Sequence, residues 1–543
     1  MFTIFSQCKS AVQIQALLLF LLFPLFQLSK NPESCLTNHA HKDIMAASCT
    51  QYAIVRLISQ KGTGNAMKPT DWIIQYIEAN RDIFIQTACD IWDHPELAFH
   101  EDYACALLTS LLEKEGFRIT PHIAGMTTAF IAEYGSGSPV IGIMGEYDAL
   151  PNLSQVAECT VRTPIVEGGA GHGCGHNLLG TGSAAAAIAV RHYMEKQQLP
   201  GTLRFYGCPA EEGGSGKAYM ARSGLFKDLD AAFCWHPSRY LSPWMVRMNA
   251  NVSLEFWFKG ISAHAASAPH MGRSALDACE LMNVGANYLR EHLPPNAKIH
   301  YAYLDAGGKA PNVIPERAGV KYIVRAATLD DVNSVRARIE RIAQGAALMT
   351  DTQLTVKYNE GCSDYIPNIT LTKLMGKAVE EVGPIVYDEA DYALARKIRN
   401  SLSPDCTKGI AWQFTGLTPD EAAEYYRTHL LYDLPGKFYN REYYAPASTD
   451  VGDVSHCVPT AQVEVPCYTI GTPNHTWQMT SQTRSTIGQK GMLEAAKCIG
   501  SCVAMLLEDR SGSFIKDARE EFERTVGSST YVCPFPDSLK PQR

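Results

Sequence analysis

Apolar runs that end in polar turns recur along the chain. Residues 140–145, 203–208, 231–235 and 465–470 lack the alternation of a half-exposed strand, which is typical of strands buried on both faces of a mainly parallel sheet. Each run leads into a turn that carries acidic or histidine residues. Because ligands bind beyond the carboxyl ends of parallel strands, we expect these four turns to meet at one edge of an α/β fold.

The pattern changes between about residues 251 and 359. Strand-like and helix-like segments follow one another there, at residues 252–258, 274–292, 299–304, 320–325, 330–349 and 353–358. Their order, strand, helix, strand, strand, helix, strand (βαββαβ), predicts a ferredoxin-like α+β domain with a four-stranded antiparallel sheet. We expect this domain to be inserted into the larger α/β domain.

A chain of 543 residues is too long for one compact core, so at least two domains are expected. An amphipathic helix is expected to open at Met67, with two helix-like stretches over residues 73–115 and a peripheral insertion over residues 387–444. The predicted division is an N-terminal leader or irregular extension (1–66), the first part of the catalytic domain (67–250), the inserted lid or dimerisation domain (251–365), the second part of the catalytic domain (366–510) and a C-terminal tail (511–543).

The composition of the chain is that of a globular enzyme and excludes some other classes of protein. Hydrophobic residues make up 46% and charged residues 19% of the chain, which is ordinary for a globular enzyme. The formal net charge of -8 provides no basic face, so no nucleic-acid partner is expected. The 17 cysteines are scattered, unlike the framework of a small disulfide-stapled protein, and most are expected to be buried free thiols.

The N-terminus carries a short apolar segment that begins at Ala16 and ends at Phe26. It is too short to span a bilayer comfortably and suits the core of a signal peptide, although only Lys9 precedes it as a cation and no clean cleavage site follows. The first 66 residues are either a targeting leader or an extension without a chemical role. We favour a cytoplasmic catalytic domain, because a thiolate metal ligand tolerates a reducing environment; secretion or membrane anchoring through this segment is the alternative.

A glycine-rich run, GHGCGHN at residues 171–177, presents a thiol and an imidazole two residues apart. Its three glycines allow the backbone to turn tightly before a helix that we expect to begin near Asn177. Cys174 and His176 can face one ion, and thiolate and imidazole suit zinc or a similar divalent metal. On its own, this spacing is weak evidence for a metal site.

Three further turns offer matching chemistry. Glu211 and Glu212 are adjacent, so in a buried cleft one of them would keep its proton unless a cation were present. With a metal nearby, one can serve as ligand and the other as general base. His236 follows an apolar strand and His475 lies in a turn, and each alone has an ordinary explanation as a core or surface histidine. Their convergence with the glycine-rich run predicts a metal centre.

These motifs resemble the aminoacylase and carboxypeptidase-G family of two-metal peptidases, and within it the amidohydrolase branch. The resemblance runs from about Met67 to Leu507. Six segments carry it: GEYDALP, GHGCGHN, PAEEGG, SAHAASAPHMGRSALDA, APNVIP and STDVGDVSH. It implies an exopeptidase-type catalytic domain, a lid domain, and two divalent metal ions, zinc or manganese, per subunit.

The resemblance also implies roles for single residues. Glu211 matches the general base that takes a proton from water. Asp148 in GEYDALP and Asp450 in STDVGDVSH are expected to support the metal ligands. Two positions depart from the family pattern: Asn177 stands where an aspartate is common, and Glu146 stands where many members have a metal-binding histidine. The positions that match the metal ligands are Cys174, His176, Glu212, His236 and His475.

The lid supplies further candidates. By the same resemblance, His264 matches a histidine that stabilises the oxyanion and often reaches the active site of the partner subunit, and Asn312 matches an asparagine that contacts the substrate. Arg273 and Arg325 are candidate clamps for a substrate carboxylate, and each also suits a structural role at the surface or at a sheet end.

The expected function is metal-dependent hydrolysis of the amide bond of an N-acyl amino acid, of the aminobenzoyl-glutamate kind. A dipeptidase that acts on β-alanyl-type dipeptides is the alternative within the family. An inactive metal-binding regulatory paralogue is an alternative of another class, against which the intact Glu211 and the complete ligand set count. The open edges of the lid sheet and the resemblance imply a homodimer, or a heterodimer with a related subunit, that forms through the lid.

Overall fold

The computed structural model describes residues 67–527 and 530–542. Lys68–Arg543 form one compact unit. The expectations for residues 1–66, including the apolar segment, lie outside the described residues. Within the described part of the chain, no helix is both long enough and apolar enough to cross a membrane.

Seven strands form the main sheet. In spatial order they are β1 (Arg118–Pro121), β2 (Phe130–Ser136), β4 (Gly201–Cys208), β3 (Val140–Glu146), β5 (Ala231–Ser238), β13 (Thr460–Pro466) and β6 (Ser242–Pro243). The four central strands, β4, β3, β5 and β13, run parallel, whereas β1, β2 and β6 pair antiparallel at the two edges. The predicted mainly parallel sheet is confirmed at its centre.

One strand lies earlier in the sequence than predicted. Strand β13 ends at Pro466, so only the first two residues of the predicted run 465–470 belong to it. The rest is buried without being a strand: the backbone N–H of Cys467 donates to the Ser238 carbonyl oxygen and that of Ile470 to the Leu430 carbonyl oxygen, each at 2.9 Å. An apolar run indicates burial, and this loop is as buried as the strand. The apolar pattern therefore placed the strand too late in the sequence.

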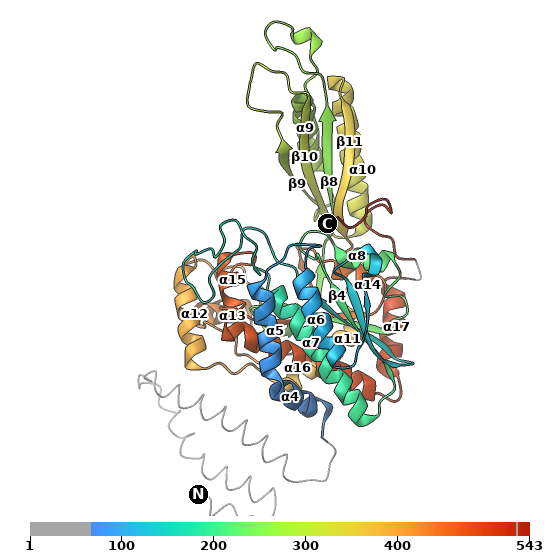
Figure 1. The fold of residues 1–543 in the computed structure, drawn as a ribbon, viewed down its shortest axis with the longest axis vertical. Coiled ribbons are helices and arrows are strands. Elements are labelled where there is room, and N and C mark those ends of the chain that lie inside the picture. The colour runs from blue at the N-terminus through green and yellow to red at the C-terminus, as the bar shows by residue number, and fades with distance from the viewer. Residues whose placement is uncertain (1–66, 528–529, 543) are drawn as a thin grey trace, which may run out of the picture. The chain divides into compact units, whose positions relative to one another are not determined.

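Two long helices, α7 (His176–Gln197) and α16 (Thr486–Glu508), lie side by side against the sheet (Figure 1). Helix α7 contains the run SAAAAIAV, and all of these small side chains are buried. They allow the helix to approach the sheet closely: a Cβ at Gly182 would lie 2.9 Å from the Trp235 ring. Helix α7 begins one residue before the predicted Asn177. The close packing fixes this start against the ends of the strands.

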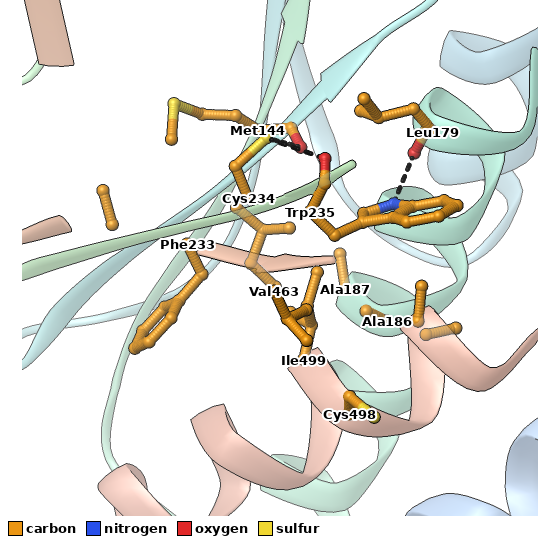
Figure 2. Packing of buried hydrophobic residues seen from close by; sticks show 14 of the residues in the cluster. Met144, Leu179, Ala186, Ala187, Phe233, Cys234, Trp235, Val463, Cys498 and Ile499 are labelled. Carbon is orange, nitrogen blue, oxygen red and sulfur yellow. Dashed lines mark hydrogen bonds between the residues drawn. The ribbon is translucent and has the colours of Figure 1, made fainter. Parts of the chain in front are cut away.

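Trp235 anchors the end of β5 to α7. The indole is fully buried, and its Nε1 donates to the Leu179 carbonyl oxygen at 3.0 Å. Figure 2 shows this bond, with Ala187 of α7 and Ile499 of α16 packed in the same cluster. Because the next residue is His236, this anchor fixes where that imidazole leaves the sheet.

The N-terminal helices differ from the prediction in number. Three helices occupy the region of residues 73–115 where two helix-like stretches were expected, and the first begins at Pro69 rather than Met67. The first helix ends at Asn80, whose backbone leaves the helical conformation (φ −111°, ψ 12°) and whose side-chain amide donates to the Tyr76 carbonyl oxygen at 2.9 Å. The three helices are α4 (Pro69–Ala79), α5 (Arg81–Asp93) and α6 (Asp102–Lys114).

A second sheet has its own core. Its elements follow the chain as β8 (Ala250–Lys259), α9 (Ala275–Leu289), β9 (Lys298–Asp305), β10 (Arg317–Ala326), α10 (Leu329–Thr350) and β11 (Gln353–Cys362). The strands are antiparallel in the order β11, β8, β10 and β9, so the predicted βαββαβ order is confirmed (Figure 1). Alternate residues of β8, such as Val252 and Leu254, pack with both helices in a hydrophobic cluster separate from the main core.

The remaining segments complete the main core. Residues 387–444, predicted as a peripheral insertion, place Tyr425 and Tyr426 in that core, so they are an integral part of it. The predicted C-terminal tail contains a helix whose Ala518 carbonyl oxygen accepts from the Asn368 side chain at 2.9 Å. The other elements are α8 (Gly216–Arg222), β7 (Val246–Met248), α11 (Ile369–Val382), α12 (Glu389–Ser401), α13 (Pro419–Thr428), β12 (Tyr443–Ala445), α14 (Val451–Ser455), α15 (Trp477–Gln482) and α17 (Ser513–Thr525).

Candidate metal centre

Two turns bring candidate ligands together. In the glycine-rich turn before α7, a Cβ at Gly171 would lie 2.1 Å from the Leu153 carbonyl oxygen, so only glycine fits there. The backbone N–H of His475 donates to the Gly173 carbonyl oxygen at 3.1 Å. The loop after β13 is therefore fixed against the turn that carries Cys174.

The five predicted ligands lie close to one another. The Cys174 sulfur is 3.4 Å from His236 Nε2. One carboxylate oxygen of Glu212 is 3.5 Å from His475 Nε2, and the other is 3.9 Å from His176 Nε2. In each of two groups, Cys174–His176–His236 and Cys174–Glu212–His475, the ligand atoms all fall within 4.8 Å of one another. The structure thus gathers thiol, imidazoles and carboxylate from four separate segments.

Hydrogen bonds orient the imidazoles of this cluster. His176 Nδ1 lies 2.8 Å from Asp148 Oδ1, and His236 Nδ1 lies 2.8 Å from the Pro237 carbonyl oxygen. In the tautomer that carries its hydrogen on Nδ1, each ring donates to its oxygen and presents the Nε2 lone pair to the cluster. His176 Nε2 and Glu212 Oε1 are buried polar atoms for which the described residues offer no hydrogen-bond partner. Such atoms fit a divalent cation that accepts lone pairs from both.

Asp148 also holds the backbone of a neighbouring ligand. Its second oxygen accepts from the backbone N–H of Glu212 at 2.9 Å. Burial raises the pKa of this carboxyl. The His176 imidazole and the Glu212 amide lower it by a larger amount, so the net pKa lies below the usual value. Asp148 therefore stays ionised and contacts two of the candidate ligands, as a supporting residue should.

Glu211 lies in a third group, with Glu146 and His176, whose ligand atoms also fall within 4.8 Å. Glu146 Oε2 is 3.3 Å from His176 Nε2. Burial and the carboxylates of Glu146 and Glu212 raise the pKa of Glu211 well above its usual range. A cluster with this much buried negative charge requires nearby positive charge to remain ionised.

The pKa values of two other ligands reflect burial. Burial and the neighbouring His176 lower the pKa of His236 to about 4, so this imidazole is neutral and can offer a lone pair. Burial and Glu212 raise the pKa of the Cys174 thiol well above its usual range. A bound cation acts in the opposite direction, because a coordinating thiol is deprotonated.

A buried lysine lies beside the cluster. Lys217, on α8, donates from Nζ to Glu146 Oε1 and to Asp450 Oδ1, at 2.6 Å each. Its backbone N–H donates to Asp450 Oδ2 at 2.9 Å. Asp450 was predicted to support the metal ligands, and the structure places it behind Lys217, whose ammonium group in turn contacts Glu146. Lys217 thus compensates part of the negative charge of the cluster.

The sequence analysis missed Lys217 and left Glu146 out of the site. A signal for Glu146 was present, because this residue ends the apolar strand that leads into Asp148, at the edge of the sheet where the other candidate residues were expected. Lys217 gave a weaker signal in the sequence, because a lysine after a glycine-rich turn is usually exposed.

The candidate residues of the predicted lid lie apart from this cluster in the sequence and form a group of their own. His264 pairs with Val313 across an isolated bridge, and the backbone N–H of Ala265 donates to the Asn312 carbonyl oxygen at 2.9 Å. His264 and Asn312 are therefore neighbours, and both are exposed. The backbone N–H groups of Ala266 and Ser267 donate to His264 Nδ1, at 3.2 Å each, which leaves the ring hydrogen on Nε2.

The two candidate arginines differ in their partners. Arg273 donates from Nε to Asp351 at 2.8 Å and from Nη1 to two backbone carbonyl oxygens. Arg325, at the end of β10, donates from Nη1 to the Ser448 hydroxyl at 2.7 Å. Ser448 lies two residues before Asp450, so Arg325 reaches the segment that borders the cluster.

Comparison with known proteins gives the family. Residues 142–397 match the sequence profile of peptidase family M20/M25/M40. The chain is 42% identical over 468 residues to one of the subunits of p-aminobenzoyl-glutamate hydrolase from Escherichia coli (strain K12), a match that covers 86% of this chain and 97% of that protein. The chain belongs to peptidase family M20/M25/M40. The predicted enzyme class, a metal-dependent amidohydrolase or peptidase that cleaves C–N amide bonds, is confirmed at the level of this family.

The chain is also similar to a dipeptidase and, in its fold, to two solved structures. Xaa-Arg dipeptidase of Homo sapiens is 32% identical over 311 residues, which are 54% of this chain and 66% of that protein. The fold is similar to that of aminobenzoyl-glutamate utilization protein from Klebsiella pneumoniae, with a TM-score of 0.53, 14% identity and coverage of 80% of this chain and 98% of that chain. A dinuclear metal binding peptidase of the family from Bacillus subtilis gives a TM-score of 0.50, 19% identity and coverage of 79% and 99%.

Replacing Lys217 with methionine removes the cation between Glu146 and Asp450. Breaking a buried ion pair from one side costs about 3–5 kcal/mol, so we expect the free energy of unfolding to fall by that amount in the chelator-treated protein. Denaturant titration followed by circular dichroism measures the change. As a control, Arg273→Met breaks the exposed pair with Asp351 and should cost less than about 1 kcal/mol. Equal losses in the two variants would contradict the role of Lys217 in charge compensation.

Proposed function

We propose that this protein is a two-metal amidohydrolase that releases an amino acid from an N-acyl amino acid, with aminobenzoyl-glutamate as the first substrate to test. The observation that carries this proposal is the cluster itself: five candidate ligand side chains converge beside Glu211, and two of their buried atoms have no hydrogen-bond partner among the described residues. The similarity over most of the chain to the p-aminobenzoyl-glutamate hydrolase of Escherichia coli supports the choice of substrate.

Each residue of the cluster has a proposed task. Cys174, His176, Glu212, His236 and His475 hold two divalent cations, zinc or manganese. When bound, such ions polarise the amide carbonyl and lower the pKa of a nearby water. Glu211 accepts the proton of the attacking water and passes it to the leaving amine nitrogen. Burial and the neighbouring Glu146 raise the pKa of Glu211 above its usual range, which favours acceptance of a proton.

The lid contributes the oxyanion donor in this proposal. His264 keeps its ring hydrogen on Nε2, the nitrogen that the two backbone amides leave free, so it can donate to the developing oxyanion. Asn312, its neighbour, contacts the substrate. The edge strand β9 leaves Tyr301, Tyr303 and Leu304 partly exposed, which supports pairing of lids in a homodimer or with a related subunit.

Recognition of the substrate carboxylate is assigned to Arg325 rather than Arg273. The Arg273 guanidinium already pairs with Asp351, whereas Arg325 donates to a neutral hydroxyl beside the cluster. A guanidinium presents several N–H donors in one plane, which matches a carboxylate.

A dipeptidase is the second candidate function. The 32% identity to Xaa-Arg dipeptidase over about half of the chain supports it. The same cluster can cleave a peptide bond, so only the substrate distinguishes the two candidates.

Glu211→Gln should abolish turnover while the metal content stays near normal. An amide cannot accept the proton of water, and general base catalysis of this kind contributes about 10² to 10⁴-fold. Metal analysis and steady-state rates with aminobenzoyl-glutamate, measured on one preparation with zinc and with manganese, test this. The control is Glu521→Gln, which changes a carboxylate far along the chain that binds the start of α11. If the Glu211→Gln enzyme keeps more than about a tenth of the wild-type activity, Glu211 is not the general base.

The cobalt(II)-loaded protein should show a thiolate-to-cobalt charge-transfer absorption that depends on Cys174. Thiolate is a strong ligand for metals of this kind, and the other proposed ligands are imidazoles and a carboxylate. Cys174→Ser should remove the absorption, whereas the matched change Cys234→Ser, at a thiol buried in the core, should retain it. Persistence of the absorption in Cys174→Ser would remove Cys174 from the ligand set.

Arg325→Met should raise KM for aminobenzoyl-glutamate more than tenfold, because a charge-assisted contact to a carboxylate contributes about 1.5–3 kcal/mol. Arg273→Met, the matched control, should leave KM within about twofold. The same panel includes β-alanyl dipeptides and dipeptides that end in arginine. Faster cleavage of a dipeptide than of aminobenzoyl-glutamate would favour the second candidate function, and an unchanged KM in Arg325→Met would reject the clamp.

A further inference from the structure

A buried carboxylate outside the ligand cluster joins two loops. Glu101, immediately before α6, is 0% exposed. Its Oε1 accepts from the backbone N–H groups of Phe99 and Ala210, at 2.9 Å each, and its Oε2 accepts from the Thr128 hydroxyl at 2.8 Å. The carboxylate therefore connects the loop before α6 to the turn of residues 209–214 (the PAEEGG turn), which carries Glu211.

The two residues that share Oε1 have an uncommon backbone conformation. Phe99 has φ +64° and Ala210 has φ +60°. The left-handed region is unfavourable for any residue with a Cβ atom, because the Cβ comes too close to the following carbonyl oxygen. Each of the two amides donates a hydrogen bond to the same buried carboxyl oxygen of Glu101, and these two bonds offset part of this cost.

The far end of the PAEEGG turn is held by packing. A Cβ at Gly214 would lie 2.4 Å from the Phe99 ring and 2.9 Å from the Ala210 Cβ. The ring of Phe99 thus lies against the end of the turn, while Glu101 holds its beginning through Ala210. Between these two points stand Glu211 and Glu212, with little freedom to move.

We propose that Glu101 is a positioning residue: it holds Ala210 in the left-handed conformation and so aims the Glu211 carboxylate at the reacting atoms. The inference rests on the proposed role of Glu211 as general base. Glu101 acts through the backbone of Ala210. Among the described residues, its carboxyl group accepts hydrogen bonds from Phe99, Ala210 and Thr128.

The first test compares two substitutions. Glu101→Met has a similar size but no acceptor, and we expect kcat for aminobenzoyl-glutamate to fall about 10²-fold, with KM and metal content unchanged, because a displacement of about 1 Å can cost that much. Glu101→Gln keeps a carbonyl oxygen for the two amides and should retain kcat within about threefold. Thr128→Val removes the third hydrogen bond without touching the turn and should also stay within about threefold. Equal kcat in the Met and Gln variants overturns the proposal.

The second test uses a rescue that a merely structural role would not give. Ala210→Gly removes the Cβ that makes the left-handed conformation unfavourable, so in the Glu101→Met background it should recover kcat roughly tenfold. Ala124→Gly is the matched control, since Ala124 also has a positive φ, +52°, but lies outside the PAEEGG turn. If Glu101→Met does not accumulate as folded protein, the two double variants are compared for recovery of folded protein. Rescue by Ala210→Gly alone supports the proposal, and equal or absent rescue overturns it.

Hydrogen exchange separates this inference from the proposed function. The amide of Ala210 should exchange faster in Glu101→Met than in the wild type or in Glu101→Gln, whatever reaction the enzyme catalyses. Unchanged exchange overturns the positioning role. If exchange rises as expected while Glu211→Gln remains active, then Glu101 does hold the turn and the base assignment alone is wrong.

Discussion

The burial of several carboxylates at one edge of a parallel sheet is the constraint on which this architecture depends. Glu146, Asp148, Glu211, Glu212 and Asp450 are buried or nearly so at or beyond the strand ends. Ionised carboxylates in such a place repel one another and lose their hydration, so each needs a donor or a cation. Lys217 compensates the charge of Glu146 and Asp450, and the His176 imidazole contacts Asp148. Glu211 and Glu212 remain undercompensated, and two divalent cations are the charge that the donor set is able to hold.

Close packing of the helices and strands fixes the positions of those carboxylates. Helix α7 begins at a candidate ligand, His176, and its small side chains allow it to lie against β3 and β5. One position on α7 leaves no room for a methyl group, because a Cβ at Gly180 would lie 2.6 Å from the Glu146 carbonyl oxygen at the end of β3. Since interiors of this density do not deform gradually, the distances among the ligand atoms are set by the fold rather than by the loops alone.

The sequence predicted the general arrangement well, because apolar runs that end in polar turns indicate both a strand and its functional end. The order of elements in the second sheet followed equally from period-two and helical patterns. The ligand set came from the resemblance to a family, and Cys174 and His176 alone could not have supplied it. What the pattern could not reveal were contacts between distant positions. Lys217 contacts a carboxylate 233 residues away, and Glu101 contacts an amide 109 residues away. A charged residue gives no periodic signal of burial, and β13 was misplaced because a buried loop is as apolar as a buried strand.

The residues proposed for this reaction are divided between two hydrophobic cores, and this division has a functional consequence. The ligands and Glu211 depend on the main sheet, whereas His264, Asn312 and Arg325 depend on the second sheet. The two clusters share, among the described residues, only the partly buried Tyr358, so a substitution in one core has little effect on the packing of the other. Under the proposed function, the chemistry of water activation can therefore stay constant while substrate recognition changes with the residues of the second sheet. The chain is similar both to a p-aminobenzoyl-glutamate hydrolase subunit and to a dipeptidase, which agrees with such a division, and under the proposed function the residues of the second sheet distinguish the two substrates.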